Sequence, residues 1–391
     1  MLSTSSNKAI QDLTPNADFY QTSENQLFQI IVPIFNEETH LEKILSKIKE
    51  HNYLKYVVFV DDASTDASLS ILKHWIAMEN INVFHLTVNS KKEGAIQSVL
   101  EALQKKSLLR PYTLIMDADA VIEKLKHDSI IYTEIEKSIT YLNQNHLSAL
   151  TYRLEAISEQ SYNIYYMSAY SEFYTMQFDN LILSKQLQLW VINGTAGLFE
   201  TKCLMSALKG MLFDFETGDL LITVKLMKDK RAIGYYPLLK IQTFVPETFS
   251  EYFSQRSRWE RGTTKILWYE KKFYLSLFKQ PLVLIIYLLL HLALYVGIFL
   301  TLIAYLLSDI SATYIILIIL YAYIFWQLFN ISKGFFLMRQ KIHSPVFFFI
   351  LCVIIHGLIW TGVTMFARIK GALDTISYLL KNRNNTEIPY K

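Results

Sequence analysis

The sequence contains only two cysteines, Cys203 and Cys352, and they lie far apart in the chain. So few cysteines exclude a cysteine-based zinc site and give no disulfide framework, which fits a protein whose main part faces a reducing cytosol. The net charge is only +3, and there is no arginine-rich stripe, zinc-finger spacing or RNA-binding aromatic motif. We therefore expect no nucleic-acid partner.

Two phosphate-binding signatures are also missing. The sequence has no G-x-x-x-x-G-K-[ST] loop and no G-x-G-x-x-G after an apolar strand. A P-loop or a Rossmann dinucleotide site is therefore disfavoured. Residues 1–26 are rich in Ser, Thr, Asn and Gln and lack an apolar core, so they do not resemble a signal peptide. We expect a disordered N-terminal tail over these residues.

Apolar residues, in contrast, are abundant: 52% of the chain is hydrophobic and only 19% is charged. Three C-terminal runs contain no Asp, Glu, Lys or Arg, at residues 281–307, 312–330 and 345–367. A membrane-spanning helix needs about 20 apolar residues. The sequence therefore predicts about three transmembrane helices within residues 281–370.

Residues 265–280, directly before the first run, mix aromatic and lysine residues. This pattern favours an amphipathic helix lying in the membrane interface, with a surface helix of the preceding domain as the alternative. The connection 331–344 holds three basic residues and 308–311 holds none, so we expect 331–344 and the N-terminal domain on the cytoplasmic side of an inner or plasma membrane. Three spans would place four basic residues outside, which leaves the number of spans open: Arg368 and Lys370, and Lys381 and Arg383 of the C-terminal tail (371–391).

The first half of the chain alternates short apolar strands with amphipathic helices. Strands are expected at residues 28–34, 56–60, 83–86 and 113–116, and helices at 38–50, from 66 onward and at 94–104. Such alternation predicts an α/β domain with a mixed, mostly parallel sheet. Ligands of such sheets bind outside the carboxyl ends of the strands, and two acidic clusters follow strands at this position.

The acidic clusters are Asp61-Asp62 and Asp117-Ala118-Asp119. Asp117 and Asp119, one residue apart at a strand end, are suited to a hard divalent cation, Mg²⁺ or Mn²⁺, whose shell substrate phosphates complete. A carboxylate after a strand can instead cap the next helix, as Asp66 could. Two pairs of like charges favour a bound cation or ligand, because they repel each other without one.

Lys92 precedes Gly94 and is a candidate phosphate ligand, with a solvated lysine near a helix start as the alternative. Residues 193–197 (NGTAG) are a candidate acceptor-side loop or an ordinary glycine-rich turn. The first turn of a helix expected at 220–230 follows Asp219, and a helix N-terminus favours the ionised form of a carboxyl group there.

These motifs together resemble family 2 glycosyltransferases with the GT-A fold. The resemblance is carried by IVPIFNEE at residues 31–38, VDDASTD at 60–66 and DAD at 117–119. QRSRW at 255–259 matches the Q-x-x-R-W signature of membrane polysaccharide synthases that make cellulose, chitin, hyaluronan and poly-N-acetylglucosamine. The resemblance covers about residues 28–270, and the C-terminal runs are similar to the membrane part of those synthases.

The resemblance implies a role for particular residues. Asp219 would be the catalytic base, Asp119 the metal ligand, and Asp117 a ligand of both the metal and the nucleotide-sugar. The remaining implied donor and acceptor residues are Pro33, Asn36, Glu37 and Asp61 or Asp62 around the uridine, Lys92 near phosphate, and Gln255, Arg258 and Trp259 around the acceptor and the diphosphate.

The sequence departs from the family pattern at several positions. Gly218 stands where an acidic residue usually precedes the base, and Glu93 stands where a small residue is common. Lys91 and Gln97 also differ from the usual Gly and Asn of that stretch. Transmembrane helices that often precede the transferase domain are missing, which puts processive polymer export in doubt unless the chain forms a homo-oligomer or has a partner subunit.

The resulting hypothesis is a membrane-anchored inverting transferase over residues 27–264. It would move a sugar from UDP-N-acetylglucosamine or UDP-glucose to a glycan, in contact with membrane lipid. The first alternative transfers a single sugar to a polyprenyl-phosphate or another lipid acceptor. The second is a non-catalytic membrane scaffold with a decayed transferase domain, which Gly218 keeps open.

Overall fold

The computed structural model describes residues 10–14, 26–123, 131–158, 163–186, 191–211, 216–277, 351–352, 355 and 365–381. The predicted spans at 281–307 and 312–330, and most of the span at 345–367, lie outside these residues. Among the described helices, none is both long enough and apolar enough to cross a membrane.

The chain divides into two compact units, which are described separately. One unit comprises Met1–Ile157 and Asn180–Phe244, and we call it the sheet unit. The other comprises Ser158–Asp179 and Val245–Lys391, and we call it the helical unit. The predicted domain of residues 27–264 therefore contributes to both units.

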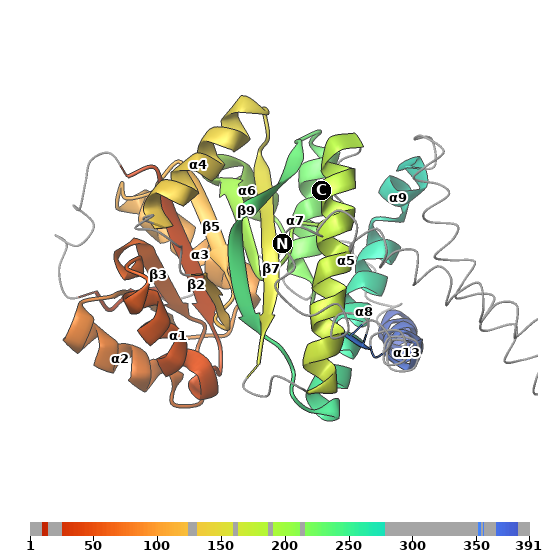
Figure 1. Ribbon diagram of the computed structural model, residues 1–391, viewed down its shortest axis with the longest axis horizontal. Coiled ribbons are helices and arrows are strands. Elements are labelled where there is room, and N and C mark those ends of the chain that lie inside the picture. The colour runs from red at the N-terminus through yellow and green to blue at the C-terminus, as the bar shows by residue number, and fades with distance from the viewer. Residues whose placement is uncertain are drawn as a thin grey trace, which may run out of the picture. The chain divides into compact units, whose positions relative to one another are not determined.

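The sheet unit is built on a nine-stranded sheet in the order β1-β4-β3-β2-β5-β8-β7-β9-β6. Figure 1 shows these strands side by side, with helices beside them. The strands are β1 (Ile10–Asp12), β2 (Phe28–Ile34), β3 (Val57–Asp61), β4 (Asn82–Leu86), β5 (Tyr112–Met116), β6 (Ala120–Ile122), β7 (Ala149–Ile157), β8 (Ala196–Glu200) and β9 (Ile233–Phe244). The helices are α1 (Glu38–Glu50), α2 (Ser68–Glu79), α3 (Lys91–Lys105), α4 (Ile131–Gln144), α6 (Thr201–Leu208) and α7 (Gly218–Lys228).

The sheet is mixed, as predicted, but parallel pairs do not dominate it. The pairs β2–β3, β2–β5, β3–β4 and β7–β9 are parallel. The pairs β1–β4, β5–β8, β6–β9 and β7–β8 are antiparallel. The alternation of strands and helices in the first half predicted the parallel part. Each crossover helix carries the chain back, so that the next strand runs parallel to the one before it. Later strands enter the sheet in both directions, and the early pattern carries no information about them.

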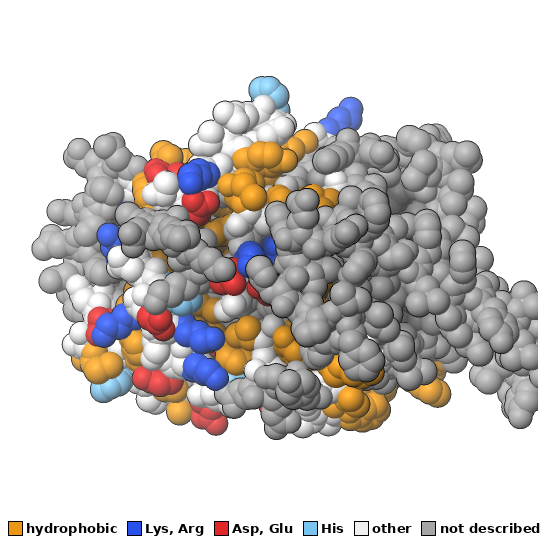
Figure 2. Space-filling model, in the orientation of Figure 1, with side chains coloured by type: hydrophobic (Ala, Val, Ile, Leu, Met, Phe, Trp, Pro, Cys, Tyr) orange, Lys and Arg blue, Asp and Glu red, His pale blue; other side chains and the backbone are white. Residues whose placement is uncertain are grey.

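Burial explains why the early elements form. All seven residues of β2 are buried, which suits a strand covered on both faces. In α1 the buried residues are Leu41, Ile44, Leu45 and Ile48, which recur at helical spacing and face the core. Opposite charges are interspersed over the described surface that Figure 2 shows, as the small net charge leads one to expect.

Part of the predicted disordered tail is ordered. Ile10–Asp12 forms β1, which pairs antiparallel with β4, and Lys106 forms an ion pair with Asp12. The prediction failed because this short edge strand is held by pairing with a distant strand, and not by an apolar pattern of its own.

The helical unit contains α8 (Phe249–Tyr269), α9 (Lys271–Leu277), α13 (Met365–Lys381) and the first part of α5 (Ile164–Gln186). The predicted interfacial helix at 265–280 is divided, since its first residues end α8 and the next form α9. Helix α13 covers residues 371–381 of the predicted C-terminal tail. Gly371 lets α13 approach α8 closely, because a Cβ there would lie 2.8 Å from the backbone nitrogen of Arg261.

Candidate active site

Asp117 and Asp119 follow β5 in a tight turn. The Asp117 amide donates to the carbonyl oxygen of Thr195 at 3.0 Å, and the Ala120 amide donates to the carbonyl oxygen of Asp117 at 3.1 Å. Backbone hydrogen bonds therefore hold the turn. One Asp119 carboxylate oxygen, Oδ1, is buried and has no hydrogen-bond partner in the described part of the chain. Burial, with the nearby carboxylates of Asp117 and Glu37, raises the pKa of Asp119 to about 7.

This turn fits a divalent cation. A buried carboxylate oxygen without a partner is unfavourable, and a bound cation would satisfy it and keep Asp119 ionised. No cluster of three or more His, Cys, Asp or Glu side chains among the described residues could hold a metal alone. Two carboxylates completed by substrate phosphates form the usual Mg²⁺ site of phosphate-handling proteins.

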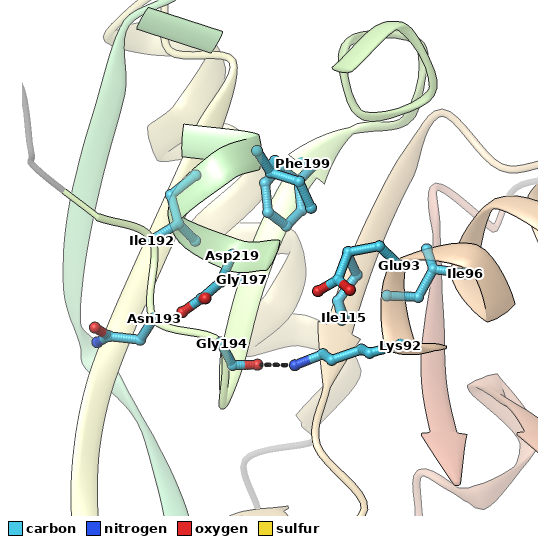
Figure 3. A pocket seen from close by; sticks show the side chains of 11 residues that line it. Lys92, Glu93, Ile96, Ile115, Ile192, Asn193, Gly194, Gly197, Phe199 and Asp219 are labelled. Atoms are coloured by element: carbon cyan, nitrogen blue, oxygen red, sulfur yellow. Dashed lines mark hydrogen bonds between the residues drawn. The ribbon is translucent and has the colours of Figure 1, made fainter. Parts of the chain in front are cut away.

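Lys92, at the start of α3, lies in this site with its side chain 29% exposed and its ammonium held by two acceptors. Its ammonium donates to Asp117 Oδ1 and, at 2.7 Å, to the carbonyl oxygen of Gly194 (Figure 3). Burial alone would lower the pKa of Lys92, but the Asp117 carboxylate raises it above its ordinary value. Lys92 is therefore a fixed positive charge that joins the end of β5 to the loop before β8.

Asp219 lies in the first turn of α7 and is partly buried. Burial raises its pKa, while Lys92 and the backbone N–H groups of Leu220 and Gly194, which bond to the carboxylate, oppose the rise. Gly194 has no room for a side chain, because a Cβ there would lie 2.9 Å from Asp219 Oδ2. The loop before β8 therefore packs directly on the predicted base.

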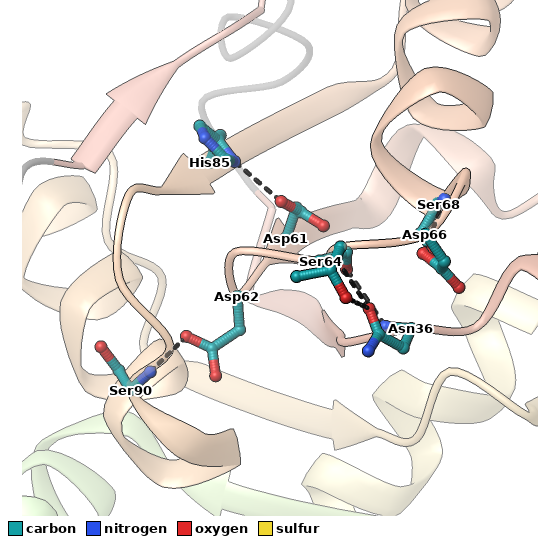
Figure 4. A network of polar contacts seen from close by, with 9 residues as sticks. Asn36, Asp61, Asp62, Ser64, Asp66, Ser68, His85 and Ser90 are labelled. Carbon is teal, nitrogen blue, oxygen red and sulfur yellow. Dashed lines mark hydrogen bonds and ion pairs between the residues drawn. The ribbon is translucent and has the colours of Figure 1, made fainter.

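Asp61 and Asp62 end β3 and have different environments. Asp61 is fully buried and its Oδ2 lies 2.7 Å from His85 Nδ1, while its Oδ1 has no partner among the described residues (Figure 4). Asp62 Oδ1 accepts a hydrogen bond from the Ser90 amide at 2.6 Å, which fixes the start of α3. Asp61 thus has one buried oxygen without a partner among the described residues, and Asp62 has at least a structural role.

The loop after β2 is held by side chains from the loop after β3. Asn36 has a φ of 57°, and its Oδ1 accepts from the Thr65 amide at 2.8 Å. The Glu37 amide donates to Ser68 Oγ at 2.8 Å, and Pro33 is buried within β2. Asp66 Oδ1 accepts from the Ser68 amide at 2.9 Å and Oδ2 from the Glu38 amide at 3.0 Å, so Asp66 links the two loops, while the N-cap of α2 is Ala67.

The structure therefore brings one group of predicted residues together. Lys92 forms an ion pair with Asp117 and lines the same pocket as Asp219, and its positive charge opposes the rise in the pKa of both Asp119 and Asp219. Gln255, Arg258 and Trp259 instead belong to α8 of the helical unit.

Within α8, the sequence analysis missed Arg256, the second residue of the QRSRW stretch. Arg256 is 3% exposed and forms a bidentate ion pair with Glu172 of α5, with nitrogen–oxygen distances of 2.6 and 2.5 Å. Its guanidinium lies 4.7 Å from the ring centroid of Tyr252 and 4.4 Å from that of Trp259. Arg256 therefore positions Trp259, whereas Arg258 is exposed.

Glu93 is a second residue of interest that was seen only as a departure from the family pattern. It follows Lys92 on α3, is 5% exposed and lines the same small pocket as Asp219 and Gly194. Burial raises the pKa of Glu93 to about 7, with Lys92 opposing the rise and Asp219 and Asp117 adding to it.

Two family models match the chain. Glycosyl transferase family 2 matches residues 29–204, and glycosyl transferase family group 2 matches residues 139–329. The chain therefore contains glycosyltransferase family 2 domains and is a glycosyltransferase.

Individual curated relatives are similar to the chain at low sequence identity. Poly-beta-1,6-N-acetyl-D-glucosamine synthase from Staphylococcus epidermidis is 24% identical over 262 residues, which are 64% of this chain and 59% of that protein. Poly(ribitol-phosphate) beta-N-acetylglucosaminyltransferase from Staphylococcus aureus is 25% identical over 134 residues, 34% of this chain and 21% of that protein. The chain thus matches less than two thirds of each relative's length.

A solved structure supports the fold. A mannosyltransferase from Pyrobaculum calidifontis in complex with GDP-Man and Mn²⁺ has a TM-score of 0.50 and 16% identity, covering 90% of this chain and 87% of the other. At this identity the similarity concerns the fold alone, and it agrees with the predicted GT-A-like α/β architecture.

Proposed function

We propose that this glycosyltransferase transfers a sugar, with inversion, from a UDP-sugar to a hydroxyl group of a glycan. The observation that carries the proposal is that Lys92 forms an ion pair with Asp117 and that its charge acts on both Asp119 and Asp219. This arrangement combines a candidate cation-binding turn, a positive charge and a partly buried carboxylate that can act as the base, all within the sheet unit.

Each residue has a role in the proposed reaction. Asp219 accepts the proton of the attacking acceptor hydroxyl, whose oxygen bonds to the anomeric carbon while the bond from that carbon to the diphosphate breaks. Lys92 offsets the negative charge at the end of β5. Asp119 and Asp117 would hold Mg²⁺ or Mn²⁺, which supplies Lewis-acid stabilisation of the leaving diphosphate. One base is sufficient because direct displacement forms no covalent intermediate.

The donor pocket is proposed at the ends of β2 and β3. Asp61 Oδ1 would accept a hydrogen bond from the uracil ring of the donor. The other residues proposed to line this uridine pocket are Pro33, Asn36, Glu37 and Asp62. N-acetylglucosamine is the favoured sugar, because both relatives compared above are named for its transfer. UDP-glucose is the second candidate donor.

The acceptor side is proposed to include Gln255, Arg258 and Trp259. The Trp259 ring, positioned by Arg256, offers an aromatic face against which a sugar ring can pack. Arg258 is exposed and supplies a positive charge for the diphosphate. This stretch favours a glycan acceptor over a polyprenyl-phosphate, and processive synthesis through an oligomer or partner subunit remains a subordinate proposal.

We also propose that the chain is a multi-pass protein of the inner or plasma membrane with its catalytic part in the cytoplasm. The support is the sequence alone, namely the three uncharged runs and the basic connection 331–344. Alkaline carbonate extraction should leave the protein in the membrane fraction. Recovery in the supernatant would contradict the anchoring.

The test of the activity is release of UDP by the purified full-length protein in detergent, supplied with Mn²⁺ or Mg²⁺ and a panel of UDP-sugars. Asp219→Asn should abolish acceptor-dependent release. The matched control is Asp229→Asn, at the exposed end of the same helix, which should behave as the wild type. Full activity of Asp219→Asn would exclude Asp219 as the base, and product size would separate single transfer from polymerisation.

A further inference from the structure

Gly218 and Glu93 occupy one space between α3 and α7. A Cβ built on Gly218 would lie 1.9 Å from both Cδ and Oε1 of Glu93 and 2.5 Å from its Cγ. These distances are far below van der Waals contact, so residue 218 can carry no side chain while Glu93 keeps its position. The carboxyl group of Glu93 therefore fills the place of a side chain beside Asp219.

The Glu93 carboxyl faces a cavity and has little else to bind. Together with Asp219 and Gly194 it lines a cavity of about 20 Å³, enough for one water molecule or one hydroxyl group (Figure 3). Among the described residues, the only hydrogen-bond donor to this carboxyl is its own backbone N–H. A carboxyl group that is 5% exposed and so weakly satisfied is unfavourable for the fold on its own.

The chemistry of the pair favours a hydroxyl ligand. With a pKa raised to about 7, Glu93 can be neutral near physiological pH, and it can then both donate and accept a hydrogen bond. Lys92 favours the ionised form of both carboxyl groups, but only Asp219 also receives the backbone N–H groups of Leu220 and Gly194, which favour its ionised form further. Two carboxyl groups in different environments suit an acceptor that places one hydroxyl in this cavity against Glu93 while the neighbouring, reacting hydroxyl meets Asp219 from outside it.

We propose that Glu93 is a specificity-determining residue that hydrogen-bonds an acceptor hydroxyl next to the one that Asp219 deprotonates. The acceptor class is a sugar or another polyol, because a second hydroxyl is required. The proposal rests on the proposed function. It also explains two departures as one, since the acidic group missing at Gly218 is supplied by Glu93 from another helix.

The alternative hypothesis is that Glu93 has a structural role only and packs α3 against α7. The two hypotheses predict different effects of a substitution. Loss of packing lowers stability and affects donor and acceptor alike, whereas loss of an acceptor contact raises the acceptor KM selectively.

The experiment compares Glu93→Ala, Glu93→Gln and the double variant Glu93→Ala/Gly218→Asp in full-length protein. UDP-N-acetylglucosamine is the donor, and a β-1,6-linked N-acetylglucosamine trisaccharide is the acceptor probe. In the double variant the carboxyl group is carried by residue 218 instead of residue 93. Its position should be similar, because a Cβ on residue 218 would lie 1.9 Å from Cδ of Glu93. Glu101→Gln, at an exposed site on α3, is the control.

Glu93→Ala should raise the acceptor KM at least about tenfold, the effect of about 1.4 kcal/mol and the scale of one hydrogen bond. The donor KM and the slow release of UDP without acceptor should stay within about twofold of wild type, given that hydrolysis needs no acceptor contact. Glu93→Gln, which keeps the shape, should raise the acceptor KM less, and the double variant should recover most of the loss.

Three results would overturn the inference: an unchanged acceptor KM in Glu93→Gln and Glu93→Ala, an equal rise of both KM values, or no recovery in a double variant with the wild-type unfolding temperature. Should Glu93→Ala not fold, the isosteric Glu93→Gln decides by the same criteria. A wild-type protein that releases no UDP would instead refute the proposed function and the inference that rests on it, so the two failures are distinguishable.

Discussion

The ion pair between Arg256 and Glu172 gives the sharpest prediction about the helical unit. The side chain of Arg256 is 4% exposed and that of Glu172 is 18% exposed, so the pair is largely removed from water. Both oxygens of Glu172 receive a nitrogen of Arg256, and the guanidinium also faces the rings of Tyr252 and Trp259. Removing one partner leaves the other charge largely buried and without its main counter-charge.

The magnitude follows from that burial. Breaking a buried ion pair by removing one member destabilises a protein by about 3–5 kcal/mol, whereas an exposed pair contributes about 0–1 kcal/mol. In a unit of this size each kcal/mol corresponds to about 2–4 °C in unfolding temperature, so Arg256→Met should lower it by about 6–20 °C. Lys137→Ala is the control, because Lys137 pairs with Glu134 while 59% exposed and should change little.

Unfolding is measured by tryptophan fluorescence on heating, for Arg256→Met, Glu172→Gln and the double variant. The double variant should be more stable than the sum of the two single losses predicts, because it leaves no unpaired charge. Strict additivity, or single variants that unfold like the wild type, would refute the reasoning. Arg256→Met should also raise the acceptor KM, since Trp259 loses the guanidinium against its ring.

Three further predictions concern the sheet unit. Asp119→Ala should weaken Mn²⁺ binding in the presence of UDP at least about tenfold in calorimetry, and unchanged affinity would place the metal elsewhere. Gly194→Ala should lower kcat and change the donor KM less, because the added Cβ would lie 2.9 Å from Asp219 Oδ2 and displace this carboxylate. Equal fold-changes in kcat and in the donor KM would contradict this. Glu93 and Asp119, with pKa values raised from 4.5 and 3.8 to about 7, hold more protons in the folded than in the unfolded state between these values, so the unfolding temperature should fall as pH rises from about 5 to 8. Mn²⁺ with UDP should reduce that fall, and a rise with pH would refute both shifts.

Local patterns predicted the early fold well. The expected strand at 28–34 and helix at 38–50 coincide with β2 and α1, because burial in these elements follows the strand and helix periods directly. The site residues at the ends of β3 and β5 were found for a related reason, since the carboxyl ends of parallel strands meet at one edge. The pairing of later strands has no such local signal.

The residues that the sequence analysis missed are linked to distant partners. Arg256 and Glu172 are 84 positions apart, and each alone is an ordinary charged residue on a helix. The pairing of β1 with β4 likewise depends on contacts between distant segments. Only a three-dimensional arrangement shows that such residues are buried together.

Gly218 and Glu93 show how two departures can cancel. Taken separately, Gly218 weakens the assignment of Asp219 as base, and Glu93 places an unusual charge at the start of α3. In the structure the position of Glu93 requires Gly218, because the Glu93 carboxyl fits only where residue 218 lacks a side chain. The doubt that Gly218 raised about catalysis therefore turns into a requirement on the acceptor: a carboxyl group is present beside Asp219, but it approaches from α3. An acceptor that binds it must present its second hydroxyl toward that helix.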